Sequence, residues 1–169
     1  TPKPSSAASD VYKRQGSTYV SRRSDDWIKL KCRLRQEFVI VGYTDPQGSR
    51  SGFGAILLAV HKELRSRELI YAGRVGTGFN ADRLDEMLKK MKALEQTVSP
   101  VSTNLTGIQA KGVHWIKPKL ICEVEFAEWT SEGNLRQASF IALRTDKSVK
   151  DIIRESAKTL TSKQQLNSK

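Results

Sequence analysis

Two short patterns in this sequence combine residue types and spacing that suit chemistry at a phosphate group. In the first, Lys29 and Lys31 alternate with apolar residues in the run WIKLKC at 27–32. Because side chains of a strand point alternately to opposite faces, both ammonium groups would share one face. A phosphate between them would relieve their repulsion, since lysine is a compact point-charge donor. The alternative is an amphipathic strand whose cationic face is only solvated.

The second pattern is the run RTDK, with Arg144, Asp146 and Lys147 as its charged residues. Arginine offers a planar fork of donors and lysine a point charge, and an aspartate between them would hold the pair in register or bind near a metal ion. Phosphoryl transfer needs such groups, because it is catalysed mainly by positioning and charge neutralisation. The alternative is a helix N-terminus, in which Thr145 or Asp146 caps a short helix at 148–158. The two roles are compatible.

A larger set of residues suits contact with a nucleic-acid backbone. The chain has 29 Lys and Arg against 18 Asp and Glu, and its formal net charge of +11 favours a polyanionic partner. Glycine in the 47–51 loop would let main-chain N–H groups approach phosphates closely. The candidate DNA-binding residues are Arg33, Arg35, Gln47, Ser49, Arg50, Arg74, Lys117 and Lys119. For each of them the alternative is a solvated rim of charge around the fold.

The other chemistry-bearing residues suggest no further site. His61 and His114 lack ligand spacing with the two cysteines, Cys32 and Cys122, so we expect no metal site in the chain. Two cysteines are too few for a disulfide scaffold, and no apolar run approaches the length of a membrane span. We therefore expect a cytoplasmic chain with no membrane partner.

The elements that must position these residues are mainly β. Runs rich in β-branched and aromatic residues predict strands at 37–43, 53–60, 69–75, 119–129 and 135–143. A turn-rich loop at 44–52 separates the first two strands, and a polar loop at 97–111 precedes the fourth. Between the third and fourth strands, apolar residues recur at helical spacing over 82–96, with Asn80 or Asp82 as the N-cap.

Five strands with one helix between strands 3 and 4 is the order of a five-stranded Greek-key OB-fold barrel. Closing the barrel would remove the edge strands that an open sheet exposes. OB barrels bind nucleic acid on one face and in the flanking loops, which agrees with the charge. We assign this mainly β domain to 36–158. Residues 1–18 are expected to be a disordered linker or foreign junction, and 159–169 a polar tail.

Several segments, in order along the chain, resemble one known family. They are 26–32, 37–44, 48–54, 71–79, 113–118, 123–129 and 144–147. Together they are similar to the C-terminal region of ATP-dependent DNA ligases, and within that family to bacterial DNA ligase D, which acts in non-homologous end joining. The resemblance extends over about 19–155, and a series of motifs in the expected order is far more specific than any one motif.

The resemblance implies a role for each phosphate pattern. Lys29 and Lys31 would lie on the last strand of the nucleotidyltransferase domain, also called the adenylation domain, and touch the phosphate of the nucleotide. The remnant of that domain would be 19–35, ahead of the OB fold. The RTDK motif at 144–147 would close over ATP and orient the departing pyrophosphate. The metal would be Mg²⁺ or Mn²⁺, bound mainly to the nucleotide phosphates and to carboxylates of the adenylation domain.

The resemblance also implies the partners. The OB domain would clamp nicked or broken double-stranded DNA across its minor groove, working with its own adenylation domain. The intact enzyme would seal that DNA through enzyme–AMP and DNA–adenylate, as a monomer associated with the bacterial nucleoid. Binding would be independent of base sequence and sensitive to salt, because it is made to the backbone.

Two motifs of the family are missing. The nucleophilic lysine of a K-x-D-G-x-R motif is absent, as is the glutamate of the metal motif expected just before Tyr19. We therefore expect the last strand of a catalytic domain followed by a complete OB domain, which by itself binds DNA without taking up AMP. The alternative from another class is a free-standing OB module that binds nucleic acid without catalysis. An RNA ligase or capping enzyme shares the chemistry, but segments 48–54 and 113–118 favour a DNA ligase.

Overall fold

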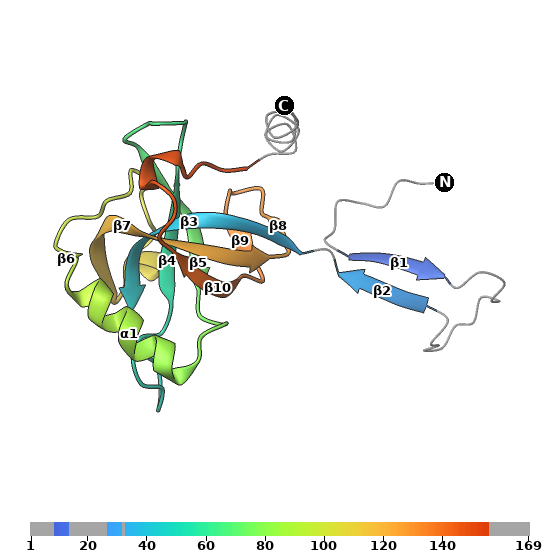
Figure 1. Ribbon diagram of the computed structural model, residues 1–169, viewed down its shortest axis with the longest axis horizontal. Coiled ribbons are helices and arrows are strands. Elements are labelled where there is room, and N and C mark those ends of the chain that lie inside the picture. The colour runs from blue at the N-terminus through green and yellow to red at the C-terminus, as the bar shows by residue number, and fades with distance from the viewer. Residues whose placement is uncertain (1–8, 14–26, 32, 156–169) are drawn as a thin grey trace.

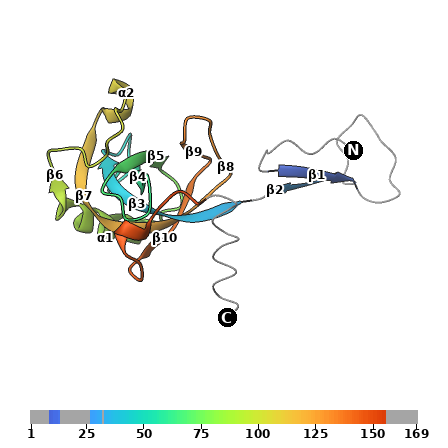
Figure 2. The same ribbon diagram turned by 90° about the horizontal axis from the view of Figure 1, so that it is seen from above.

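The computed structural model describes residues 9–13, 27–31 and 33–155. Strand β1 (Ser9–Lys13) pairs antiparallel with β2 (Trp27–Lys31), and Figures 1 and 2 show the pair as a ribbon outside the main body. The strand predicted around Lys29 and Lys31 is therefore confirmed. Strand β1 occupies part of the segment 1–18, where we expected disorder, because its backbone pairs with β2. The rest of 1–18 and the tail 159–169 lie outside the described residues.

The main body is built on one six-stranded antiparallel sheet, with the strand order β10–β7–β3–β4–β5 and β6 paired to β7. Its strands are β3 (Leu34–Thr44), β4 (Ile56–His61), β5 (Leu69–Val75), β6 (Glu95–Gln96), β7 (Val113–Phe126) and β10 (Ser139–Arg144). The first three strands form a meander, and β7 returns to lie beside β3. This return is the Greek-key connection that the order of predicted elements implied.

The two ends of the sheet meet just after β5. The backbone N–H of Phe140 in β10 donates to the carbonyl of Thr77 at 3.0 Å, and the Thr77 hydroxyl donates to the carbonyl of Ala138 at 3.1 Å. Gly78 allows this approach, since its φ is +91° and a Cβ there would collide with the backbone of Phe140. The expected mainly β OB-fold barrel, with one helix between its third and fourth strands, is confirmed.

Helix α1 (Ala81–Lys92) lies across the lower end of the barrel in Figure 1. Of the two predicted N-caps, Asn80 takes the position, and its side chain accepts from the backbone N–H of Arg83 at 3.0 Å. The apolar stripe packs inward, and its buried members are Leu84, Met87 and Met91. The helix ends before the predicted 96 because Glu95–Gln96 pairs with β7 instead.

The core is closed by aromatic and branched side chains from strands on both sides of the barrel. All six residues of β4 are buried. Phe38 of β3 packs edge-to-face against Phe126 of β7, with ring centroids 5.9 Å apart. The Trp129 ring packs against both of them. The fully buried large side chains include Phe38, Ile40, Phe53, Ile56, Leu57, Leu58, Met91, Ile116 and Phe126.

Strand β7 differs from the predicted strand 119–129. It begins earlier, at Val113, and the register with β3 jumps from Trp115 opposite Gly42 to Leu120 opposite Ile40. Residues 116–119 therefore form an extended bulge, in which four residues of β7 lie opposite a single residue of β3. The last two residues of the predicted strand form a separate short strand, β8 (Glu128–Trp129), which pairs with β9 (Leu135–Arg136). Helix α2 (Gly107–Ala110) is a single turn inside the loop predicted at 97–111.

The predicted helix at 148–158 is wrong over the described residues. Only a 3₁₀ turn, η1 (Val149–Asp151), forms there. After it, Ile153 makes a parallel bridge with His61, and the Ile152 carbonyl accepts the backbone N–H of His61 at 2.8 Å. Pairing with the end of β4 and burial of Ile152 compete successfully with helix continuation. Residues 156–158 lie outside the described residues.

Candidate functional site

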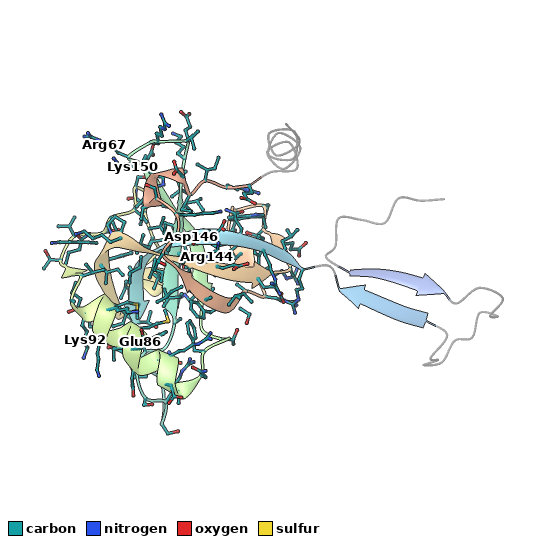
Figure 3. The ribbon with its side chains drawn as sticks, viewed as in Figure 1. Arg67, Glu86, Lys92, Arg144, Asp146 and Lys150 are labelled. Carbon is teal, nitrogen blue, oxygen red and sulfur yellow. The ribbon has the colours of Figure 1, made fainter. Side chains whose placement is uncertain are left out.

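Arg144 and Asp146, both labelled in Figure 3, form a bidentate pair at the end of β10. The Nε–H of Arg144 donates to Oδ1 of Asp146 at 2.9 Å, and Nη2 donates to Oδ2 at 2.8 Å. These bonds lower the pKa of Asp146 to about 2 and raise that of Arg144. The N-cap of η1 is Ser148, without a side-chain bond to the turn, so Asp146 orients Arg144 and does not cap a helix.

Two glutamates of the barrel wall hold the cations of the same motif. Nη1 of Arg144 donates to Oε2 of Glu123 on β7 at 3.2 Å. Nζ of Lys147 donates to Oε1 of Glu37 on β3 at 2.7 Å. We expected Asp146 to keep both Arg144 and Lys147 in register. It bonds to Arg144, whereas Lys147 bonds to Glu37 on β3.

Glu37 and Glu123 are directly opposite each other in the β3–β7 register. Their side chains are 16% and 22% exposed, and each faces one cation of the RTDK motif. Neither glutamate is among the site residues expected from the sequence. No local signal links either glutamate to the motif, because the pairing depends on strand register.

The lysine pair of the first pattern lies elsewhere. Lys29 is opposite Val11, and Lys31 is opposite Ser9, in the β1–β2 ribbon. Figures 1 and 2 show this ribbon beyond the barrel, separate from the end of β10 that carries Arg144. The structure does not bring the two phosphate patterns together.

Three of the candidate DNA-binding residues converge on one groove. Gln47 and Arg74 line a groove of about 420 Å³ beside the loop after β3, and Lys111 adds a second cation to it. An adjoining hollow of about 270 Å³ is lined by Gln47, Arg50 and Arg74. We call the two together the cationic groove; its charged lining consists of Arg50, Arg74, Lys111 and one carboxylate, that of Asp45. Lys111 was missed by the sequence analysis, because its only signal was a charge in a polar loop.

The arginines of the cationic groove are partly anchored to backbone carbonyls. Nη1 of Arg50 donates to the carbonyl of Gly76 at 2.9 Å, and Nη2 of Arg74 donates to the carbonyl of Gln109 at 3.4 Å. Arginine has five N–H donors, so each guanidinium keeps others for an anion. Donors of this kind are suited to charge-assisted hydrogen bonds with phosphate oxygens.

The remaining candidates do not line the cationic groove. Arg35 donates to Oε2 of Glu125 at 3.2 Å, and Arg33 donates to the carbonyl of Gln137 at 3.0 Å, so both belong to the opposite end of β3. The other three candidates are exposed: Ser49 in the loop, and Lys117 and Lys119 in the β7 bulge.

A second polar cluster anchors the loop that borders the cationic groove. Nε2 of His114 lies 2.8 Å from Oδ1 of Asp45, and its Nδ1 lies 3.2 Å from Oε1 of Glu95. The imidazole stacks on the ring of Tyr43 with centroids 4.9 Å apart. The Tyr43 hydroxyl donates to Glu95 at 2.5 Å, and burial together with that carboxylate raises its pKa. The cluster connects β3, β6 and β7 beneath the loop.

Over 9–13, 27–31 and 33–155, no group of three or more His, Cys, Asp or Glu side chains is arranged to hold a metal ion. Over the same residues, neither helix is long and apolar enough to cross a membrane.

Comparison with known proteins identifies relatives of the chain. The family model described as "ATP dependent DNA ligase C terminal region" matches residues 49–147. The chain is 47% identical over 145 residues to the multifunctional non-homologous end joining protein LigD of Pseudomonas aeruginosa, and 40% identical over 147 residues to that of Mycolicibacterium smegmatis. Each match covers 86% of this chain, which spans only 17% and 19% of the length of those relatives.

Solved structures agree with the sequence relatives. The ligase domain of LigD from M. tuberculosis superposes with a TM-score of 0.69 at 38% identity, covering 88% of this chain and 48% of that one. A mycobacterial DNA ligase D complexed with ATP and MES superposes with a TM-score of 0.64 at 36% identity, covering 86% and 46%. The family match contains most of the cationic groove and the whole RTDK motif. This chain therefore belongs to the family of the C-terminal region of ATP-dependent DNA ligases.

Proposed function

We propose that this chain is the C-terminal OB part of an ATP-dependent DNA ligase that joins nicked or broken double-stranded DNA. One observation carries the proposal. The barrel carries two separate groups of cations, one in the RTDK motif at the end of β10 and one along the cationic groove beside the loop after β3. A ligase needs both, because it handles nucleotide phosphates and the DNA backbone at once.

At the nucleotide end, Arg144 and Lys147 orient the pyrophosphate that leaves ATP, and Lys29 and Lys31 contact the phosphate of the nucleotide. The donor set fits a triphosphate, since Arg144 and Lys147 both retain N–H groups after their carboxylate bonds are counted. ATP supplies the AMP that activates the 5′ end of the DNA. The divalent cation, Mg²⁺ or Mn²⁺, is assigned to the nucleotide phosphates, because no described cluster on this chain suits it.

At the DNA end, the cationic groove binds the backbone of duplex DNA. Arg50, Arg74 and Lys111 supply the charge, and Gln47 supplies a neutral donor. The other partner is an adenylation domain, which carries the nucleophilic lysine. In this proposal the complete ligase acts as a monomer on chromosomal DNA in a bacterial cell, in the end-joining pathway named for its LigD relatives.

A free-standing OB module that only binds nucleic acid is the second candidate. The cationic groove by itself favours it, because DNA binding requires no RTDK motif. The two candidates differ in what happens when the motif is changed. In a binding module, a substitution in the RTDK motif would only reduce the positive charge available for DNA. In a ligase, it would impair the step in which pyrophosphate leaves ATP.

The test uses the full reading frame that encodes the chain. Under the proposal it encodes a K-x-D-G-x-R lysine, and its product seals a labelled nicked duplex with ATP. Arg144→Ala slows adenylation from ATP about tenfold to a hundredfold, the range expected for one donor to a developing negative charge. It leaves sealing of a pre-adenylated nick near the wild-type rate.

The matched control for this test is Arg136→Ala, which removes another surface arginine that is paired with a glutamate, Glu128. Equal adenylation rates for the wild type and Arg144→Ala would contradict the role of the motif. A reading frame without the nucleophilic lysine, and a product that binds DNA but seals nothing, would favour the binding module.

A further inference from the structure

We infer that Glu123 and Glu37 are positioning residues that orient Arg144 and Lys147 for the pyrophosphate of ATP. The inference rests on the proposed function, because it takes pyrophosphate as the ligand of the motif. It starts from the two cross-barrel bonds, from Arg144 Nη1 to Glu123 at 3.2 Å and from Lys147 Nζ to Glu37 at 2.7 Å.

The placement of the two carboxylates is costly without these cations. Glu37 and Glu123 are direct cross-strand neighbours, and like charges in that position destabilise a sheet. Both side chains are largely shielded from water by the strands around them. The motif contributes one cation to each carboxylate, so the repulsion is offset only when Arg144 and Lys147 are docked on this wall.

The carboxylates fix the cations without using all their donors. The Arg144 guanidinium has five N–H groups, of which Asp146 takes two and Glu123 takes one. One N–H therefore remains on each of Nη1 and Nη2. The Lys147 ammonium has three donors, and Glu37 takes one. A phosphate group can be bound by the remaining donors while the carboxylate bonds stay in place.

The three carboxylates, of Asp146, Glu123 and Glu37, contact different donor groups of Arg144 and Lys147. Asp146 lies two residues from Arg144 and aligns the guanidinium through its Nε and Nη2 edge. Glu123 contacts the remaining terminal nitrogen from β7, so the plane of the guanidinium is held from two directions. Lys147 donates its hydrogen bond to Glu37 on β3, and its charge also acts on neighbouring Asp146.

An ordinary surface ion pair is not expected to orient a cation for pyrophosphate. The chain offers one for comparison, between Arg136 and Glu128 on the β8–β9 hairpin, with an N–O distance of 2.9 Å. It joins an exposed arginine to a partly exposed glutamate and has no third group. Glu128→Ala is therefore a matched control for the loss of one surface carboxylate.

The experiment titrates the ¹⁵N-labelled 169-residue chain with inorganic pyrophosphate and follows Arg144 Nε and Lys147 Nζ by NMR. The informative comparison is Glu123→Gln against Glu123→Ala. Both variants remove the same negative charge, which alone would strengthen anion binding equally. Only glutamine keeps an acceptor for Nη1 of Arg144, so the comparison isolates orientation from charge.

We expect Glu123→Ala to bind pyrophosphate about threefold to fivefold more weakly than Glu123→Gln, which corresponds to the modest net worth of one partly buried hydrogen bond. Glu37→Ala should differ from Glu37→Gln in the same direction, with the effect read at Lys147. Glu128→Ala should change neither signal. Equal affinities for the alanine and glutamine variants at both positions would overturn the inference.

The same titration also tests the proposed function. If pyrophosphate does not shift Arg144 or Lys147 in the wild-type chain, the assignment of the motif to pyrophosphate fails, and the positioning role fails with it. If the wild type binds but the matched variants do not differ, only the positioning role fails.

Discussion

Asp146 accepts two hydrogen bonds from the guanidinium of Arg144, from Nε at 2.9 Å and from Nη2 at 2.8 Å, although only one residue separates them in the chain. The turn after β10 folds the carboxylate back along the arginine, so the motif is aligned before any ligand binds. Preorganised donors of this kind are worth more to a developing negative charge than mobile ones.

The first prediction concerns the pH at which this pair separates. The pKa of Asp146 is lowered from its ordinary 3.8 to about 2, mainly by the hydrogen bonds from Arg144. A lowered folded-state value means that the pair stabilises the fold above pH 3.8 and loses that contribution as pH falls toward 2. Carbon-13 NMR should show the Asp146 carboxyl titrating near pH 2, and at a higher pH in Arg144→Ala, where the backbone hydrogen bond and the charge of Lys147 still favour the carboxylate. An unchanged midpoint in that variant would contradict the pairing.

The second prediction concerns DNA binding by the cationic groove. Arg74→Ala and Lys111→Ala should each weaken binding to a nonspecific duplex and reduce the log–log salt slope by about 1, because each would remove one phosphate contact of the proposed binding mode. Fluorescence anisotropy over a range of KCl concentrations measures both quantities. Arg136→Ala, outside the groove, is the charge-matched control. The same loss of slope in all three variants would mean that total charge, and not the groove, determines binding.

The third prediction concerns closure of the barrel at Gly78. Its φ of +91° disfavours any side chain, and a Cβ would collide with the backbone of Phe140, whose N–H bonds to Thr77. Gly78→Ala should therefore cost about 1–3 kcal/mol of unfolding free energy beyond the conformational strain. Gly133→Ala is the control, since its φ is +80° but nothing lies within 4 Å of its Cβ. Urea denaturation of both variants measures the difference, and equal losses would exclude a role for the clash.

The fourth prediction concerns Cys122. Its side chain is fully buried in β7, and burial raises the pKa of the thiol. The thiolate is the reactive form, so Cys122 should resist alkylation in the folded chain and react once the chain is unfolded. Peptide mapping after iodoacetamide treatment, with and without urea, reports this directly. Rapid labelling of Cys122 under native conditions would show that the β3–β7 wall opens readily.

Local patterns in the sequence predicted most of the barrel. The strand expected at 69–75 is β5 without a change of bounds, and the stripe of Leu84, Met87 and Met91 is the buried face of α1. These predictions succeed because period-two and period-3.6 patterns are carried by neighbouring residues. The resemblance of ordered motifs to DNA ligases, which the family match confirms, likewise needs only residue types and their order.

The predictions that failed depended on partners far away in the chain. The helix expected at 148–158 does not form over the described residues, because His61 bonds to the carbonyl of Ile152 and bridges Ile153. The bulge at 116–119 in β7 likewise arises from its register with β3. Pairing across the barrel overrides local preference when it buries a side chain and satisfies a strand end.

Residue types and their order were enough to predict a basic chain, the RTDK motif and the order of strands in an OB barrel. The partners of these residues follow from the tertiary structure. It brings Lys147 to Glu37, 110 residues earlier in the chain, and joins Arg74 to Gln47 and Lys111 around one groove. The physical reason is register. A shift of one residue between β3 and β7 would turn Glu37 and Glu123 to opposite faces, and no local pattern in the sequence states that alignment.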